Sequence, residues 1–354
     1  MEAQALPSVA CLGQSLSAGI WFRDSGIQLD NGGVSRYYRG DTQTHLPVST
    51  EITGYAAHGL LGIDPDAALR AGEFLVNYAW DEDQQTFPFE TDGTQSAYFF
   101  DLGIIARGLL ALWRYTGSSL WLEMAAAAGD AMLRDFEAHH GYHVIVDLPG
   151  KRPRDHSTWW SQRSGCFQLK AALAWRELAD ATGNHLYWRH FQRQLDFAVE
   201  TAPEFFALWR DDLRVMDLLH AYCYYLEGLL ADWSKHAGLI RDGIQTVQRY
   251  RRTLQDQFLR SDVCAQLLRV RLLAHHLDVV RLDAAAAEEE VSALRVFQMD
   301  SEDPRLNGAF AFGIRQNNML PHANPVSTIF ALQALQWWSD YEAGTFNAVP
   351  VDII

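Results

Sequence analysis

The segment Asn31-Gly32-Gly33-Val34, followed by Leu46-Pro47-Val48-Ser49-Thr50, has a counterpart near the other end of the chain. There, Asn307-Gly308-Ala309-Phe310 is followed by Asn324-Pro325-Val326-Ser327-Thr328. The asparagine precedes the serine by 18 residues in the first copy and by 20 in the second. Matching first and last units are typical of a repeat array, and here they favour a closed one. We therefore expect residues 31–50 and 307–327 to take the same shape and to lie side by side.

Helical periodicity dominates the sequence between the two copies. One series of predicted helices is rich in small residues and apolar on several sides, as buried helices are: 49–62, 97–115, 160–182, 217–235, 261–277 and 326–341. A second, amphipathic series alternates with it and would cover it: 65–79, 118–137, 184–199, 237–257 and 281–297. We predict an all-α fold, a single α/α toroid spanning residues 1–354. It would have six inner and at least five outer helices, and the region near 3–20 would supply a twelfth.

The connections between these predicted helices alternate in length. Asp64-Pro65, Thr116-Gly117-Ser118 and Thr182-Gly183-Asn184 are short turns that lead from an inner to an outer helix. The return connections are longer and aromatic: 80–96, 138–159, 200–216 and 298–325. Long connections on one rim of a scaffold are where function is expected.

Composition excludes some partners and indicates a compartment. The formal net charge of −15 argues against nucleic acids and anionic membranes as partners. No apolar run reaches the ~18 residues that a membrane crossing needs, and the first residues do not resemble a signal peptide. The four cysteines lie far apart without a CxxC pair, so we expect reduced thiols and a cytoplasmic protein.

The C-terminal unit resembles a known group of folds. The stretch Asn307–Gly313, then Leu320-Pro321 and Ser327–Leu335, is similar to a repeat unit of squalene-cyclase and prenyltransferase-type toroids. The stretches Phe100–Ala111 and Tyr115-Thr116-Gly117 resemble helix pairs of the α/α (six-hairpin) toroids, including those that act on polysaccharides. This resemblance implies the fold, whereas the chemistry has to come from the site.

The cyclase resemblance fails at the residues that would do the chemistry. Squalene-type cyclases carry an acidic motif where this chain has His322–Thr328, which contains no carboxylate. A zinc-ligand set like that of the prenyltransferases cannot be assembled either, and the loop histidines His139, His140 and His143 lack the spacing of a zinc helix. No phosphate-binding glycine motif is present, so no cofactor and no metal are expected. The resemblance to hydrolases, lyases and epimerases of sugars remains.

Glu51 and Asp101 are the first catalytic candidates. Each lies near the start of a predicted inner helix among apolar or small residues, where a carboxylate is costly unless it is used or paired. Neighbouring inner helices would place both on one rim, where two carboxylates can act as acid and as base or nucleophile on a glycosidic bond. The alternative is a structural role, with helix capping and Arg107 as partner.

Aromatic and basic candidates for substrate binding follow in the third predicted helix. Trp159 and Trp160 begin it after a polar loop, and paired aromatic rings at a rim suit stacking on sugars. Core packing is the alternative for either of them. Lys170 would lie in the middle of this helix, where it could meet a substrate carboxylate, pair with Asp101 or extend to the surface.

The fourth to sixth predicted inner helices add a second set. His220, Tyr224 and Glu227 share one helix face, with Tyr222 nearby, and histidine with tyrosine suits proton transfer. A satisfied core cluster is the alternative. Asp262, Gln266 and Arg269 repeat the arrangement on the next helix, where Asp262 could be a cap and Arg269 a clamp for an acidic sugar. Asn318 and His322 are substrate-binding candidates on the last connection.

Together these features favour a carbohydrate-active enzyme: a glycoside hydrolase, a polysaccharide lyase or a sugar epimerase. Its partner would be an oligo- or polysaccharide. Two alternatives stay open. One is a toroid that binds a sugar or a lipid without catalysis, in a polysaccharide biosynthetic assembly. The other is an isoprenoid cyclase with a displaced acid. The first hypothesis requires two neighbouring carboxylates, the second requires aromatic residues without that pair, and the third requires a single buried acid in an apolar cavity.

Overall fold

The structure is a computed structural model that describes residues 9–91, 93, 95–154, 160–206 and 212–354. Its contacts divide the chain into two compact units. The first contains Met1–Ile27, Tyr37–Leu46 and Trp209–Ile354, and the second contains Gln28–Arg36 and Pro47–Leu208.

In the second unit, helices of two kinds alternate along the chain. The inner series is α2 (Thr50–Gly59), α4 (Phe99–Thr116) and α6 (Leu169–Thr182). The outer series is α3 (Pro65–Phe74), which continues into a π-helical turn at Leu75–Ala79, α5 (Ser119–Phe136) and α7 (His185–Thr201). A small antiparallel sheet joins β3 (Ser96–Tyr98), β4 (Ile145–Asp147) and β5 (Arg152–Pro153).

The first unit repeats this alternation. Its inner helices are α8 (Asp212–Leu229), α10 (Ser261–His276) and α12 (Pro325–Glu342), and its other helices are α1 (Val9–Asp24), α9 (Trp233–Leu254) and α11 (Ala284–Phe297). One sheet joins β1 (Tyr38–Arg39), β2 (Thr44–His45) and β9 (His322–Ala323). Another joins β6 (Phe258–Arg260), β7 (Gly313–Arg315) and β8 (Asn318–Met319).

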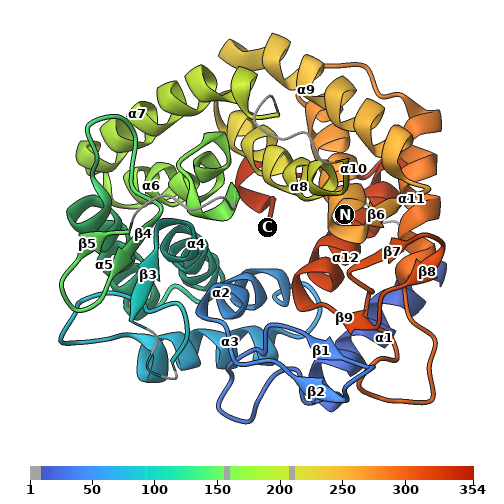
Figure 1. The fold of residues 1–354 in the computed structure, drawn as a ribbon, viewed down its shortest axis with the longest axis horizontal. Helices are drawn as coiled ribbons and strands as arrows, with labels where there is room; N and C mark the ends of the chain where they lie inside the picture. Colours follow the sequence, from blue (N-terminus) through green and yellow to red (C-terminus); the bar gives the residue numbers. More distant parts are fainter. Residues whose placement is uncertain (1–8, 92, 94, 155–159, 207–211) are drawn as a thin grey trace, which may run out of the picture. The chain divides into compact units, whose positions relative to one another are not determined.

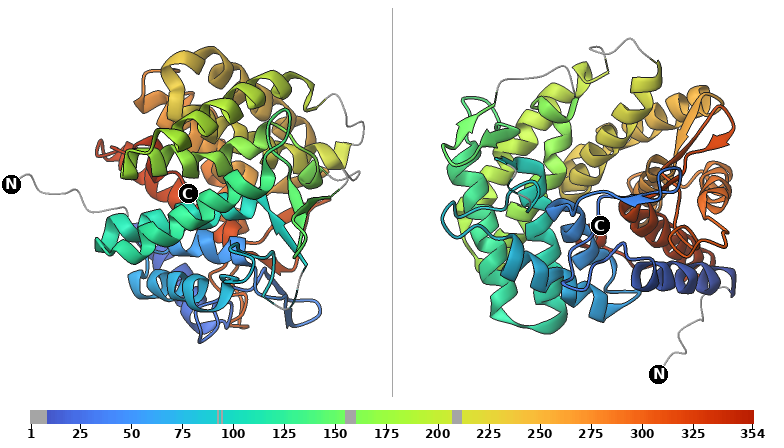
Figure 2. Two further views of the ribbon diagram at one scale, coloured as in Figure 1. Left: turned by 90° about the vertical axis from the view of Figure 1, so that its left-hand side faces the viewer. Right: turned by 60° about the horizontal axis from the view of Figure 1, so that its bottom comes forward.

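The two helix series differ in burial as the sequence predicts. Helix α4 buries 14 of its 18 residues, whereas the outer helix α5 buries seven of 18. In the other unit, α10 buries 14 of 16 residues and α11 six of 14. Helices α5 and α7 lie on the same side of α4 and α6 in Figure 1, and they come to the front when that side is turned toward the viewer in Figure 2. The inner helices are therefore the buried layer of each unit.

The predicted turns form as expected. Gly117 and Gly183 end α4 and α6 in the left-handed conformation, with φ of 72° and 70°, which glycine adopts without strain. The side chain of Asp64 caps α3 by accepting the amide of Ala67, and Pro65 follows at the first helical position. These local signals place the junction between each inner helix and its outer partner.

Two inner helices begin elsewhere than predicted. The third starts at Leu169 instead of residue 160, after short 3-10 turns at Trp160–Gln162 and Cys166–Gln168. The break lies at Gly165, whose backbone is extended and whose amide donates to the Gln168 side chain. The fourth starts at Asp212 rather than residue 217, and it ends at Leu229 instead of 235.

The two copies of the opening motif share a set of hydrogen bonds. Gly32 and Gly308 both take a positive φ, 94° and 90°. The amide of Val34 donates to Thr53 Oγ1 at 3.0 Å, and that of Phe310 donates to Thr328 Oγ1 at 2.9 Å. The helix caps correspond as well, because the side chains of Ser49 and Asn324 each accept the amide three residues later. The prediction of a common shape is confirmed.

The two copies of the repeat correspond in structure at a different alignment from the one that their sequences suggest. The Pro-Val-Ser-Thr match pairs Thr50 with Thr328, whereas the hydrogen bonds make Thr53 the equivalent of Thr328. The reason is that Pro325 is the first residue of α12, while Pro47 lies two residues before the cap Ser49. Within the first unit, Tyr38 and Arg39 of β1 pair with Ala323 and His322 of β9, so part of the first connection lies beside part of the last.

Glycines allow three inner helices of the second unit to pack closely. A Cβ atom on Gly108 of α4 would lie 2.3 Å from the carbonyl oxygen of Gly54 in α2. A Cβ on Gly103 of α4 would lie 2.4 Å from the carbonyl oxygen of Ala171 in α6. Helix α4 thus contacts α2 on one side and α6 on the other with backbone against backbone (Figure 1).

We expect Gly103→Ala to lower the free energy of unfolding by about 1–3 kcal/mol, the usual cost of overpacking a dense core. Gly62→Ala is the matched control, because a Cβ there meets nothing within 4 Å. Chemical denaturation of both variants provides the measurement. Equal stability of the two variants would show that the contact between α4 and α6 can relax at no cost.

Candidate functional site

Glu51 and Asp101 lie in the first turns of α2 and α4, the two inner helices that pack through Gly54 and Gly108. Ser49 fixes the start of α2 by capping it. Helix α4 begins directly after β3, and the amide of Phe99 donates to the carbonyl oxygen of Val144. The close packing of α2 and α4 and these fixed starts bring the two carboxylates within electrostatic reach of each other, as the sequence predicts.

The pKa values of Glu51 and Asp101 are both raised above those of free carboxyl groups. Burial raises the pKa of Glu51 to about 7, against the opposing effect of Arg36. Burial, and next the negative charge of Glu51, raise the pKa of Asp101 well above its usual value. The Asp101 side chain is 4% exposed, and its Oδ2 atom has no hydrogen-bond partner among the described residues. Both carboxyl groups therefore hold a proton more readily than an isolated carboxyl group does.

Arg36 is the cation beside this pair. It forms an ion pair with Glu90, and its guanidinium carbon lies 4.8 Å from the centre of the Phe89 ring. Its positive charge lowers the pKa of both Glu51 and Asp101, although burial outweighs it at each. Arg107, the partner that the sequence offered, instead bonds Glu177 of α6 at 2.6 Å. The arginine that acts on the pair thus comes from the segment before α2 and not from α4.

Aromatic rings gather near the starts of these helices. The rings of Phe89 and Tyr98 lie 4.8 Å apart, and the ring of Phe100 lies 6.1 Å from that of Phe167. Trp160 meets Phe167 edge to face at 5.2 Å and keeps part of its surface exposed. Trp159 lies outside the described residues. A saccharide-stacking role for either tryptophan stays a prediction.

Lys170 is placed differently from the expectation. It is the second residue of α6, not a residue in the middle of that helix, because α6 starts at Leu169. Its side chain is fully buried, so it does not extend to the surface. A role toward substrate stays a prediction.

A second cluster lies in the first unit, on α8 and α10. His220 Nδ1 is 2.8 Å from Gln266 Oε1 and 3.3 Å from Asp262 Oδ2. Its ring also meets that of Tyr224 at 4.5 Å. Burial lowers the pKa of His220, although Asp262 acts against this. The imidazole is therefore neutral near pH 7, as a general base requires. His220 and Tyr224 lie in the middle of α8, not at its start as predicted.

Asp262 is held by Arg260 and lies beside His220. Arg260 binds it through Nε at 3.0 Å and through Nη2 at 2.5 Å, and it reaches Asp217 at 2.7 Å. Burial acts to raise the pKa of Asp262, but Arg260 and then His220 outweigh it and hold this pKa below its usual value. Asp262 is thus an ionised partner of His220 rather than a side-chain cap of α10, whose cap position is Arg260.

Glu227 and Arg269 pair with each other. They are 2.7 Å apart and both side chains are completely buried. Arg269 also donates to Gln333 Oε1 at 2.8 Å and stacks on Phe330 at 4.1 Å. These contacts engage the guanidinium group, so they favour a structural role over a clamp for an acidic sugar. The same holds for Glu227, which the sequence proposed as catalytic.

Of the remaining candidates, Asn318 and His322 lie on strands and Tyr222 lies on a helix. Asn318 in β8 is exposed and bonds the carbonyl oxygen of Gln316. His322 in β9 stacks on Tyr37 with ring centres 5.0 Å apart. Burial, and next Arg39, lower the pKa of His322. Tyr222 on α8 meets the ring of Tyr225 at 5.4 Å. Their roles toward substrate stay predictions.

Sequence reasoning missed Arg36, Glu90 and Arg260. Arg36 lies 54 residues from Glu90 in the chain, and neither belongs to a helix, so no periodicity signals their contact. Arg260 is the residue before α10, two positions from Asp262, and this spacing on an extended strand end was the available signal.

The shifted pKa values predict how stability depends on pH. Because the pKa of Glu51 is raised on folding from 4.5 to about 7, its stabilising contribution is full below pH 4.5 and is lost as pH rises through 7. We expect the melting temperature of Glu51→Gln, relative to that of the unchanged chain, to be higher at pH 8 than at pH 4.5. Thermal melting of both proteins at the two pH values is the measurement. Glu123→Gln, at an exposed position of α5, is the control, and its relative melting temperature should not differ in this way between the two pH values.

No family model matches the sequence, and no curated protein resembles it significantly in sequence. Solved structures resemble it in fold. Cellobiose 2-epimerase from Spirochaeta thermophila matches with a TM-score of 0.69 at 14% identity, over 92% of this chain and 96% of that one. D-mannose isomerase matches with 0.68 at 12%, over 95% and 99%. The GH76 α-mannanase of Bacteroides thetaiotaomicron matches with 0.62 at 11%, over 92% and 96%. The chain therefore has the α/α-toroid fold.

Proposed function

We propose that this protein is a carbohydrate-active enzyme that hydrolyses a glycosidic bond of an oligo- or polysaccharide. The observation that carries the proposal is the electrostatically linked pair of Glu51 and Asp101. Two neighbouring carboxyl groups with raised pKa values can supply the acid and the base or nucleophile that glycoside hydrolysis needs. A toroid without catalysis does not require such a pair, and an isoprenoid cyclase would use a single buried acid.

The two carboxyl groups have different roles in this proposal. Asp101, the more buried one, keeps its proton near neutral pH and donates it to the leaving oxygen through the Oδ2 atom that lacks a partner among the described residues. Glu51, whose pKa is about 7, acts as base or nucleophile when ionised. Arg36 limits the rise of both pKa values, and it also contacts Phe89 and Glu90.

The comparisons support a sugar as substrate. The solved structures of similar fold are named as enzymes of cellobiose, of mannose and of mannan. The rings of Phe89, Tyr98, Phe100 and Trp160 near the helix starts suit contact with sugar faces. Among the described residues, no helix has the length and apolar character needed to cross a membrane. We propose the cytoplasm as its location, because Cys166, Cys223 and Cys264 are free and buried thiols.

A second candidate function is epimerisation or isomerisation of a sugar at the His220 cluster. A neutral imidazole that is oriented by Gln266 and Asp262 can take a proton from a carbon next to a carbonyl group. Two of the similar structures are named as an epimerase and an isomerase. Elimination by a lyase would need the same base. Hydrolysis increases the number of reducing ends, whereas epimerisation does not, so one assay separates them.

We expect Glu51→Gln and Asp101→Asn each to lower turnover by about 10²-fold or more, as loss of a general acid or base does. Both substitutions keep the shape of the side chain. Release of reducing ends from mannan, starch and cello-oligosaccharides, together with product analysis by NMR, gives the measurement.

Asp66→Asn, at an exposed position in the first turn of α3, is the matched control and should keep full turnover. If Glu51→Gln and Asp101→Asn both keep near-normal turnover while His220→Asn loses it, the chemistry belongs to the His220 cluster and the hydrolase proposal is wrong.

A further inference from the structure

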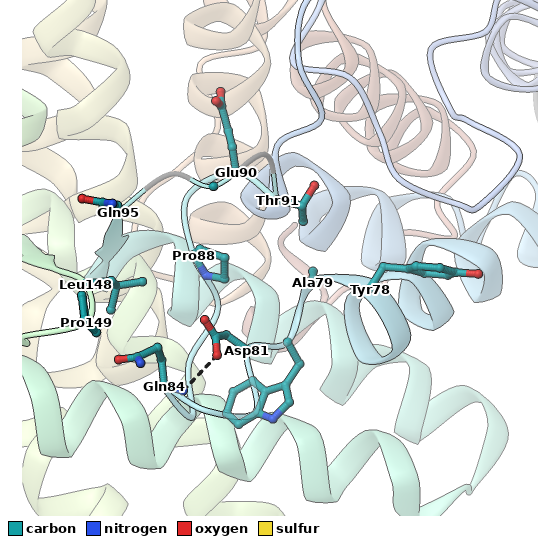
Figure 3. A pocket seen from close by; sticks show the side chains of 12 residues that line it. Tyr78, Ala79, Asp81, Gln84, Pro88, Glu90, Thr91, Gln95, Leu148 and Pro149 are labelled. Atoms are coloured by element: carbon teal, nitrogen blue, oxygen red, sulfur yellow. Dashed lines mark hydrogen bonds between the residues drawn. The ribbon is translucent and has the colours of Figure 1, made fainter.

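An open groove of about 420 Å³ lies in the second unit, outside the carboxylate pair (Figure 3). Asp81 and Gln84 lie at one end of it and Glu90 at the other, with Pro88 and Ala79 between them. Gln95, Leu148 and Pro149 form one side, and Tyr78 stands on the opposite side (Figure 3). Trp80 and Thr91 also line the groove.

The walls of this groove are held in place before any ligand arrives. The backbones of Asp81 and Thr86 pair, and Asp81 Oδ1 accepts the amide of Gln84 at 2.9 Å. The ring of Trp80 packs edge to face on that of Phe87 at 5.0 Å, and Phe87 is 1% exposed. A fixed turn and an anchored indole reduce the entropy that binding would otherwise cost.

The lining has the chemistry of a site for an uncharged sugar. It offers two aromatic side chains, Tyr78 and Trp80, together with carboxylate and amide groups that can bond hydroxyls. Tyr78 is 63% exposed, so its ring is open to a partner. The lining residues in the described part of the chain include Asp81 and Glu90 but no lysine or arginine. An acidic sugar would meet the like charge of Asp81 there, whereas the charge of Glu90 is compensated by Arg36, which does not line the groove.

The groove is connected to the carboxylate pair through its Pro88–Glu90 wall. The Thr50 hydroxyl donates to the carbonyl oxygens of Pro88 and Phe89, at 2.9 and 3.2 Å, and Glu51 is the next residue. Glu90 lines the groove and also pairs with Arg36, the cation that acts on Glu51 and Asp101. A ligand in the groove would thus touch the segment that borders the site.

We propose that this groove is a binding subsite for neutral hexose units of the saccharide. Tyr78 and Trp80 contact sugar faces, and Asp81, Gln84, Glu90 and Gln95 accept or donate bonds to hydroxyls. The assignment as a subsite of the catalysed substrate depends on the proposed function, whereas the binding itself does not. It also narrows the substrate class from sugars in general to uncharged ones.

The test is calorimetric titration of the full chain with the tetraoses of mannose, glucose (malto- and cello-linked) and, as the acidic probe, galacturonate. We expect at least one neutral tetraose to bind, and the galacturonate tetraose to bind at least tenfold more weakly. Tyr78→Ala should weaken the neutral tetraose by about fivefold to tenfold, the size of one lost aromatic contact. Gln84→Ala should also weaken it. Tyr115→Ala is the matched control, because Tyr115 is similarly exposed, at 56%, and does not line the groove.

Three results would each overturn the subsite. Tyr78→Ala and Gln84→Ala could both leave binding unchanged, the acidic tetraose could bind as tightly as the neutral ones, or no neutral tetraose could bind at all. If the subsite is correct but the proposed hydrolase function is wrong, the results differ. Tyr78→Ala still weakens binding of the neutral tetraose, while Glu51→Gln and Asp101→Asn do not affect hydrolysis. If both proposals hold, Tyr78→Ala raises KM for the same tetraose and leaves kcat unchanged.

Discussion

The close approach of α4 to α2 and α6 is the constraint on which the second unit depends. Gly54, Gly103 and Gly108 leave no room for a Cβ atom, so the three helices meet backbone to backbone. Because α2 and α4 both start next to fixed strand or cap residues, this approach also decides where Glu51 and Asp101 lie. The packing that stabilises the core thus places two carboxyl groups where the charge of Glu51 raises the pKa of Asp101.

Such a placement is costly for stability. A buried carboxylate loses hydration, and here Arg36 compensates only in part, since the pKa of each group stays raised. A protein that needed only a stable core would fill these positions with apolar side chains. Glu227 differs, because Arg269 forms a direct ion pair with that buried glutamate at 2.7 Å. The pKa of both Glu51 and Asp101 stays raised, whereas Glu227 is held in an ion pair that is a structural contact. This difference is why the first pair carries the functional proposal.

Much of the fold could be predicted from local signals in the sequence. The small-residue helices, the caps at Gly117 and Gly183, and the repeat of the asparagine-glycine turn all agree with the structure. The start of α6 was missed because Gly165 interrupts a stretch whose aromatic residues look helical. The pairing of Glu51 with Asp101 could be anticipated from helix starts alone. The role of Arg36 could not, since it depends on a contact between two irregular segments, and the engagement of Arg269 by Glu227 depends on the packing of α8 on α10.

The central claim is that Glu51 and Asp101 titrate as a linked pair. NMR titration of the full chain with carbon-13 in the aspartate and glutamate carboxyl groups tests it most directly, with Glu51→Gln and Asp101→Asn used to assign the signals. The signals assigned to Glu51 and Asp101 should titrate well above the usual range, that of Glu51 near pH 7, and Glu51→Gln should lower the pKa of Asp101 because it removes the neighbouring negative charge. Glu290, whose pKa burial also raises to about 7, should give a further signal that neither substitution removes. Glu51 and Asp101 signals that both titrate near pH 4, or an Asp101 signal that Glu51→Gln leaves unchanged, would contradict the account.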